Sequence, residues 1–242
     1  MYINKKGEFI IENYQKGKTF SSFLSGIAGK SGIPMWVFYV NRGQGIASFG
    51  IENKDNAILE FLPANKSYQT VQLKGFRTFI KYLDENASIN IYEPFTGNSP
   101  GISRMIIAPH SLKIEEVNQD EQLAIEVKYF VLPGEDFPSL VRRLVVKNLA
   151  GQARNIEILD GLPEIIPYGL SNIALKEVSQ TMSAWSRVYN LENRIPFYRI
   201  KASTDDSPEV RKLEKGHFYF AFTDENSILK PLVDPQIIFG ED

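Results

Sequence analysis

The residues best suited to binding chemistry lie in one predicted turn. Asn41, Arg42 and Gln44 follow the aromatic run WVFYV (36–40) and precede the run IASFG (46–50). Their amide and guanidinium groups are planar and carry several hydrogen-bond donors and acceptors, which suit the hydroxyl groups of a sugar. We therefore expect this turn to have a binding or interface role, and the aromatic residues before it to lie mainly in the core.

Residues that could catalyse a reaction are few. The chain has no cysteine and two histidines, His110 and His217, which are far apart in the sequence. A zinc site would need carboxylates to complete its ligands. We expect no catalytic residue, no metal and no cofactor.

Adjacent charged residues are not a catalytic signature either. Neighbours in a strand point to opposite faces, so two adjacent carboxylates cannot act as acid and base on one substrate. We expect such pairs to lie at exposed strand edges and turns. The pairs are Glu115-Glu116, Glu135-Asp136, Asp205-Asp206 and the basic pair Arg142-Arg143.

The overall charge excludes several classes of partner. The 242 residues include 27 Lys and Arg against 29 Asp and Glu, for a net charge of -2. No basic surface is expected, so neither nucleic acid nor a membrane is a predicted partner. The absence of cysteine is typical of a reducing compartment, and the N-terminus has too short an apolar run for a signal peptide. The prediction is a cytoplasmic protein.

Extended runs dominate the chain and predict an all-β fold. The runs 123–132, 140–147 and 154–159 are separated by turn-forming clusters and predict a β-meander. In the first of them, apolar and polar residues alternate, which predicts an antiparallel sheet with one face on a core. The architecture that suits such strands is a sandwich of two sheets. Further strands are expected at 8–11, 36–40, 46–50, 57–63, 75–82, 88–92, 103–108, 111–117, 197–202, 217–222 and 236–239.

One segment has the spacing of a helix. Leu175, Val178, Met182, Trp185 and Tyr189 recur every three or four residues, which predicts a covering or crossover helix. Ser171 or Asn172 is the expected N-cap. No repeat or linker interrupts the chain, so residues 1–242 are expected to form a single domain.

Three segments together resemble a known family. They are FSSFLSGIAGKSGIPMWVFYVNRGQGIASFGIENKDNAILEF, then NIYEPF, then VKYFVLPGEDFPSLVRRLVVKNLAGQARNIEILDGLPEI. This order resembles the amino-terminal β-sandwich of the inverting glycoside phosphorylases of glycoside hydrolase family 94, which include cellobiose and chitobiose phosphorylases. The glycine-bearing opening is more similar to phosphorylases of β-1,2-oligoglucans.

The resemblance implies a fold, an activity and a set of partners. The fold would be an antiparallel β super-sandwich of the galactose mutarotase-like kind, truncated at its C-terminal end. The catalytic (α/α)6 barrel, which holds the general acid, would be absent from these residues. Inorganic phosphate would be the co-substrate of the parent enzyme, which converts β-glucosides or β-oligoglucans to α-glucose 1-phosphate.

In that family the sandwich helps to shape the acceptor side of the cleft and the homodimer interface. The resemblance therefore adds Thr96 and Asn98, from the loop 96–101, to Asn41, Arg42 and Gln44 as substrate-binding or interface residues. The implied partners are the chain's own C-terminal barrel, a β-glucan oligosaccharide and a second copy. One alternative is a stand-alone carbohydrate-binding or interaction sandwich. Another is a sugar epimerase, which would need a histidine and a carboxylate converging on one face.

Overall fold

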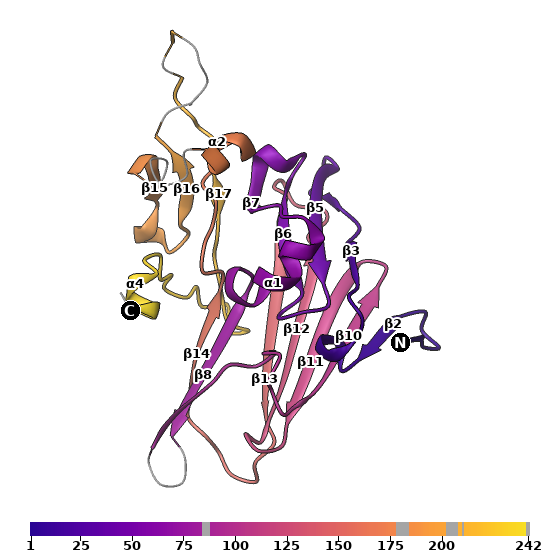
Figure 1. Cartoon of the computed structure of the whole chain (residues 1–242). Helices are drawn as coiled ribbons and strands as arrows, with labels where there is room; N and C mark the ends of the chain where they lie inside the picture. Colours follow the sequence, from indigo (N-terminus) through magenta and orange to yellow (C-terminus); the bar gives the residue numbers. More distant parts are fainter. Residues whose placement is uncertain (84–87, 178–183, 202–207, 210, 241–242) are drawn as a thin grey trace. The chain divides into compact units, whose positions relative to one another are not determined.

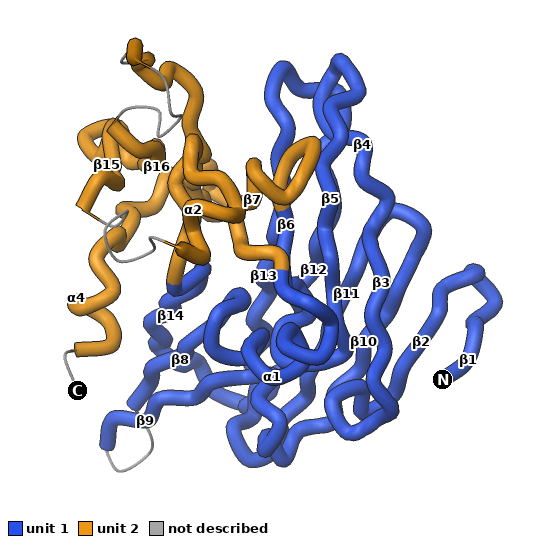
Figure 2. Tube along the Cα trace, turned by 45° about the horizontal axis from the view of Figure 1, so that its top comes forward, with its two compact units in different colours: residues 1–49, 62–163 blue, residues 50–61, 164–242 orange. Residues whose placement is uncertain are grey.

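The computed structural model describes residues 1–83, 88–177, 184–201, 208–209 and 211–240, and the chain is mostly β (Figure 1). It divides into two compact units (Figure 2). The first unit comprises Met1–Phe49 and Leu62–Pro163, and the second comprises Gly50–Phe61 and Glu164–Asp242. The all-β class is confirmed at this level, and a single domain over 1–242 stays a prediction. Each unit is described by itself below.

The largest element of the first unit is a six-stranded antiparallel sheet. Its register places Leu112 opposite Tyr129, and Tyr129 opposite Arg142. Because side chains alternate along each strand, these three share one face, together with Ile114 and Val127. All four of the uncharged residues named here are fully buried. The strands, in spatial order, are β1 (Tyr2–Ile3), β2 (Phe9–Glu12), β10 (Ile102–Ala108), β11 (Ser111–Asn118), β12 (Leu123–Val131) and β13 (Leu140–Asn148).

The opposite face of this sheet carries charged pairs. Arg104 Nη2 lies 2.6 Å from a Glu115 oxygen across the β10–β11 pair, and Lys113 Nζ lies 3.4 Å from Glu126. These side chains are partly exposed, so each pair contributes little to stability. The predicted alternation of one core face and one polar face is confirmed.

A second sheet contains the predicted hairpin. Strands β5 (Ile33–Val40) and β6 (Ile46–Ile51) are neighbours, and β3 (Ser21–Phe23) and β4 (Ile27–Ala28) both pair with β5. Gly45 has a φ of +86°, and a Cβ there would lie 3.0 Å from Leu112 Cδ2. The turn therefore packs tightly on the six-stranded sheet, and glycine suits it on both counts. Phe38 is in the core as expected, whereas Trp36 is only partly buried.

A third sheet corrects the predicted meander. Its order is β14 (Ile156–Gly161), β8 (Arg77–Leu83) and β9 (Ile89–Tyr92). The prediction that the run 154–159 continues the meander is wrong, because β14 pairs with β8 and not with β13. The local pattern indicates a strand but does not specify its partner, which lies far upstream. This pairing places Thr78 opposite Asp160.

The sequence did not predict helix α1 (Ala64–Lys74). Most of its residues are polar, and only Ser67 and Val71, one turn apart, are buried. The helix ends at Gly75, whose N–H donates to the Val71 carbonyl at 2.9 Å. A Cβ at Gly75 would lie 2.6 Å from that oxygen and 2.9 Å from the carbonyl oxygen of Ile46, so glycine permits this close approach to β6. A short 3₁₀ helix, η1 (Tyr14–Lys16), also belongs to this unit.

The second unit contains a small antiparallel sheet and short helices. The sheet has the order β15 (Ser186–Tyr189), β16 (Phe197–Ile200) and β17 (His217–Phe218). None of the described helices is long and apolar enough to cross a membrane. Its other elements among the described residues include η2 (Lys54–Asn56), β7 (Ala57–Leu59), α2 (Asn172–Glu177), η3 (Leu191–Asn193) and α4 (Gln236–Phe239).

Two predictions in the second unit need correction. The expected helix begins at Asn172, where the Ser171 hydroxyl accepts a hydrogen bond from the N–H of Ala174, but Tyr189 lies in strand β15. Val178 and Met182 lie outside the described residues. The expected strand 236–239 is helix α4, because Pro235 favours a helix start and the Asp234 carboxylate accepts from the N–H of Gln236 at 3.0 Å.

Acidification is expected to weaken the second unit through His217. Burial lowers the pKa of His217 below its ordinary value, although its Nδ1–H donates to the Ile166 carbonyl at 2.7 Å. The unfolded state then binds the proton more readily, so stability falls as the pH drops below about 6.5. Urea unfolding of the chain at a series of pH values measures this loss.

Two histidine variants test whether His217 causes this loss of stability. His217→Gln is expected to flatten the pH dependence between about pH 7 and pH 5. His110 is exposed, so His110→Gln should leave that dependence as it is. An unchanged slope in His217→Gln would contradict the assignment.

Candidate functional site

A small recess in the first unit gathers polar side chains from separate elements. It lies between the hairpin turn, helix α1, the start of β8 and the loop that follows β9. Its free volume is about 10 Å³, which is roughly the room that one water molecule needs. We call this site the recess; its lining residues are Gly43, Gln44, Gln72, Phe76, Glu93, Pro94, Phe95 and Thr96.

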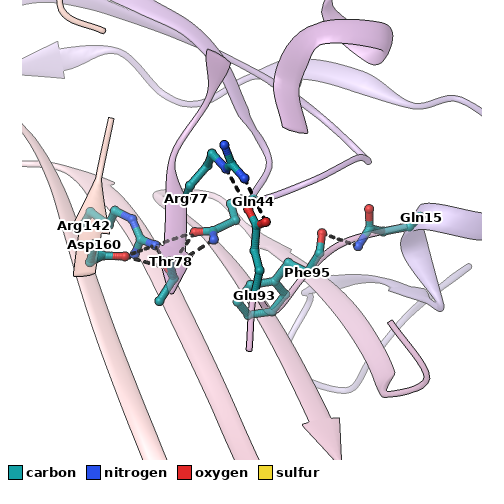
Figure 3. Close-up of polar contacts among 8 residues, drawn as sticks. All are labelled: Gln15, Gln44, Arg77, Thr78, Glu93, Phe95, Arg142 and Asp160. Carbon is teal, nitrogen blue, oxygen red and sulfur yellow. Dashed lines mark hydrogen bonds and ion pairs between the residues drawn. The ribbon is translucent and has the colours of Figure 1, made fainter. Parts of the chain in front are cut away.

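Gln15, the middle residue of η1, joins three walls of the recess. Its side-chain oxygen accepts from the N–H of Gly43 at 3.0 Å and from Gln72 Nε2 at 3.3 Å. Its side-chain nitrogen donates to the carbonyls of Phe95, at 2.7 Å, and Thr96, at 3.2 Å. Figure 3 shows the bond from Gln15 to Phe95. One amide therefore holds the hairpin turn, the helix and the loop together.

Gln44 belongs to a set of four hydrogen-bonded side chains, which we call the polar chain (Figure 3). Its members are Asp160, Thr78, Gln44 and Arg142. The Thr78 hydroxyl lies 2.6 Å from Asp160 Oδ1, and Gln44 Nε2 lies 3.1 Å from the Thr78 hydroxyl. Arg142 Nη2 lies 2.7 Å from Asp160 Oδ1 and 2.9 Å from the Thr78 oxygen, and it also donates to Gln44 Oε1. The polar chain thus connects the recess to the ion pair of Arg142 and Asp160, whose side chains are 7% and 25% exposed.

The prediction that Arg142 is exposed is wrong. Its side chain is 7% exposed, because it projects from β13 onto the buried face of the six-stranded sheet. Its guanidinium carbon lies 5.2 Å from the ring centre of Phe76 and 5.5 Å from that of Tyr129. Burial raises the pKa of Tyr129 well above its ordinary value despite the nearby Arg142 charge, so its hydroxyl stays neutral. The aromatic rings and the Asp160 carboxylate compensate part of the buried charge, while Arg142 Nε and Nη1 have no hydrogen-bond partner among the described residues.

Glu93 supplies the carboxylate of the recess. Its two oxygens accept from Arg77 Nε at 2.7 Å and from Arg77 Nη2 at 2.8 Å, as Figure 3 shows. This two-pronged pair fixes the orientation of the carboxylate. Each oxygen has a second lone pair, so Glu93 can still accept a hydrogen bond from a ligand.

A second buried carboxylate holds the loop that lines the recess. Glu116 is fully buried; its oxygens accept from the N–H of Phe95 at 2.9 Å, from the Ser99 hydroxyl at 2.6 Å and from the Tyr92 hydroxyl. Glu115 does point to the opposite face, as predicted, but the expectation that Glu116 lies at an exposed edge is wrong. Three donors compensate its burial and fix the loop.

Gln44 and Thr96 are the two predicted site residues that line the recess. The other three do not line it, and Asn98 is exposed. Asn41 is fully buried, and its side chain bonds the carbonyls of Tyr14, at 2.9 Å, and Lys18, at 2.8 Å. Its role in the fold is therefore to hold the segment before β3.

Arg42, like Asn41, has a role in the fold. Its guanidinium donates to the carbonyls of Gly17, at 3.0 Å, and Asn41, at 2.7 Å. These bonds brace the hairpin turn against the chain after η1. The binding or interface role of the five residues stays a prediction.

Other candidate chemistry is not found at the recess. Neither histidine lines it, so the epimerase alternative gains no support there. Over the described part of the chain, no three or more His, Cys, Asp or Glu side chains are grouped so as to hold a metal ion. Glu135 and Asp136 are exposed as expected, and Asp205 and Asp206 lie outside the described residues.

Adding a methyl group at Gly43 is expected to disturb the recess wall. Gly43 has a φ of +51°, and its Cβ would lie 3.2 Å from Gln72 Cγ and 3.4 Å from Gln72 Cα. Gly43→Ala should therefore cost the left-handed backbone penalty of about 1–2 kcal/mol and a further amount for the clash with α1. Urea unfolding measures the total.

Gly134 provides the matched control, since its φ is +79° and nothing lies within 4 Å of its Cβ position. Gly134→Ala should cost the backbone penalty alone. Equal losses in the two variants would contradict the packing of Gly43 on Gln72.

Comparison of the sequence with models of protein families finds no match, and comparison with curated proteins finds none. The recess is therefore interpreted from its chemistry. Amide, carboxylate and hydroxyl groups lie there beside the rings of Phe76 and Phe95, and the free volume of about 10 Å³ has room for one water molecule or one ligand oxygen.

Proposed function

We propose that the chain is the non-catalytic amino-terminal sandwich portion of an inverting glycoside phosphorylase, and that the recess faces the sugar on the acceptor side of the cleft. The parent enzyme would cleave β-glucosides or β-oligoglucans with inorganic phosphate to give α-glucose 1-phosphate. One observation carries this proposal. The three sequence stretches that resemble the family meet at the recess and the polar chain: Gln44 comes from the first, Glu93 from the second, and Arg142 and Asp160 from the third.

Core packing alone would not require polar residues of the three stretches to lie together. Strands from the three stretches could pack through apolar residues, with their polar residues turned to solvent. Instead, Arg142 and Gln44 turn polar groups inward and bond to each other. Buried polar groups are costly unless they are paired, and we propose that this bonded set supports the recess.

The layers of the first unit support the sandwich. The buried face of the six-stranded sheet receives the hairpin turn at Gly45 and the ring of Phe76, whose centre lies 5.5 Å from that of Tyr129. A covered apolar face on an antiparallel sheet is one feature that a sandwich requires. The galactose mutarotase-like super-sandwich is the member of this class that we propose.

The chemistry of the recess suits a supporting role. In an inverting phosphorolysis, an acid protonates the leaving oxygen while phosphate attacks the anomeric carbon from the opposite face. Both groups would belong to the catalytic barrel. The recess would instead hold part of the acceptor sugar and so help to position it.

Phosphate release from α-glucose 1-phosphate tests this function. D-glucose, cellobiose, laminaribiose and sophorose would serve as acceptors for this chain and for the product of the uninterrupted gene. We expect activity only in the longer protein. Activity of the 242-residue chain would contradict the supporting role, and activity in neither would contradict the phosphorylase proposal.

A substitution in the recess tests whether the recess contributes to acceptor binding. In the longer protein, Gln72→Leu should raise the acceptor KM about fivefold to tenfold, because the wall of the recess loses the hydrogen bond from Gln72 to Gln15. Gln119 is exposed and distant from the lining residues in sequence, so Gln119→Leu is the matched control. Equal kinetics in both variants would place the acceptor elsewhere.

The second candidate is a stand-alone carbohydrate-binding or interaction sandwich. It is favoured by the fact that all the residues lining the recess lie in the first unit. It predicts binding of gluco-oligosaccharides by this chain with no phosphorolysis in any longer product.

A further inference from the structure

The polar chain has a fixed direction. An ionised carboxylate only accepts hydrogen bonds and a guanidinium only donates them, so Asp160 and Arg142 define its two ends. Thr78 has one hydroxyl hydrogen, which goes to Asp160 Oδ1 at 2.6 Å, the shorter of its contacts with an acceptor. The Thr78 oxygen must then accept from Gln44 Nε2 at 3.1 Å. Gln44 Oε1 consequently accepts from Arg142.

This direction determines what Gln44 can offer to the recess. Of its two amide hydrogens, one is used by Thr78, and one of the two lone pairs of Oε1 is used by Arg142. One N–H donor therefore remains on a residue that lines the recess and whose amide cannot turn over without breaking both bonds. Glu93 also lines the recess and can only accept.

We propose that the recess is a subsite for a single sugar hydroxyl, which accepts a hydrogen bond from Gln44 and donates one to Glu93. Arg142, Thr78 and Asp160 are then positioning residues, which act on the ligand through the orientation of the Gln44 amide. The inference rests on the proposed sugar-facing role of the recess and specifies which group of the sugar is recognised.

Both the size and the charge of the recess favour a hydroxyl. A free volume of about 10 Å³ suits one oxygen and not a whole ring. An ionised carboxylate or sulfate has no hydrogen to donate to the remaining lone pairs of Glu93, and neither has an ether oxygen, whereas a hydroxyl can use both Gln44 and Glu93. The charge of Arg142 does not attract an anion here, because its side chain is 7% exposed and paired with Asp160.

Binding of methyl β-D-glucopyranoside and of its 2-, 3-, 4- and 6-deoxy and deoxyfluoro derivatives tests the subsite, with NMR titration of the full chain. At one ring position, the deoxy form should bind about fivefold to tenfold more weakly than the parent sugar. The fluoro form at that position should bind no better than the deoxy form, because fluorine cannot donate to Glu93. Equal affinity across all positions would overturn the inference.

The positioning role is tested by a matched pair of variants. Thr78→Ser keeps the hydroxyl, so it should retain the discrimination between sugar and deoxy sugar. Thr78→Val removes the hydroxyl at similar size and should reduce the discrimination to less than twofold. Full discrimination in Thr78→Val would show that the polar chain does not position Gln44.

A measurement without ligand covers the case in which Thr78→Val does not fold. In Asp160→Asn, the side-chain amide can donate to the Thr78 oxygen. The Thr78 hydroxyl hydrogen is then free to point elsewhere, and the direction of the polar chain is no longer fixed. The side-chain amide hydrogens of Gln44 should exchange slowly in the parent chain and faster in Asp160→Asn. Equal exchange would overturn the positioning role.

If the parent chain binds none of the glucosides, the sugar-facing function fails together with the subsite; if it binds them all equally, only the subsite fails.

Discussion

Glu116→Ala is expected to lower the free energy of unfolding by about 3–5 kcal/mol. The substitution leaves the N–H of Phe95 and the hydroxyls of Tyr92 and Ser99 without their acceptor. Each buried donor that loses its partner costs about 1–3 kcal/mol, and the vacated space costs more. Urea unfolding of the full chain measures the change.

Two further substitutions complete this test. Glu116→Gln keeps the shape and one acceptor oxygen, so its loss should be smaller. Glu126→Ala, on the neighbouring strand, removes a partly exposed carboxylate and should cost less than about 1 kcal/mol. If Glu116→Ala were as mild as Glu126→Ala, Glu116 would not hold the loop that lines the recess.

Arg142→Ala is expected to cost about 3 kcal/mol. Removing one member of a buried ion pair typically costs 3–5 kcal/mol, and the lower end applies because Asp160 is 25% exposed. Gln44 and Thr78 would also lose a donor, and the space between Phe76 and Tyr129 would be left unfilled.

The neighbouring residue on the same strand is the control. Arg143 is exposed on the opposite face, so Arg143→Ala should change the free energy of unfolding by less than about 0.5 kcal/mol. Arg142→Lys keeps the charge without the planar fork and should fall between the two. Equal stability of Arg142→Ala and Arg143→Ala would contradict the burial of Arg142.

Local patterns were sufficient to predict the hairpin. The aromatic run before Asn41 and the glycines of the turn predicted β5 and β6 to within a few residues. The pair β12 and β13 was predicted equally well from alternation and the Pro133-Gly134 turn. In both cases the partner strand is the next along the chain, so pattern and turn together specify the pairing.

Non-local pairing was not predictable in the same way. Strand β14 was expected beside β13, but its partner is β8, which lies far upstream in the sequence. Helix α1 was missed because its polar surface hides the spacing of Ser67 and Val71. Pro63 before it and Gly75 after it are the boundary signals that could have indicated a helix. Because Gln72 lies in this helix, it was not predicted as a site residue.

The site was predicted in part. Gln44 and Thr96 were identified from the chemistry of their loops and from the resemblance, and they share the recess. Glu116 and Arg142 were assigned to the surface because charged residues are rarely buried. Only the register, which places both on the inner face of the six-stranded sheet, shows that they are buried and paired.

The sugar-facing recess is tested most directly by titrating the ¹⁵N-labelled chain with cellobiose, laminaribiose and sophorose. We expect the largest chemical-shift changes on Gly43, Gln72 and Thr96, which line the recess, and no change on Gly134 and Arg143. Shift changes confined to other residues, or none with any of the three sugars, would contradict the sugar-facing role of the recess.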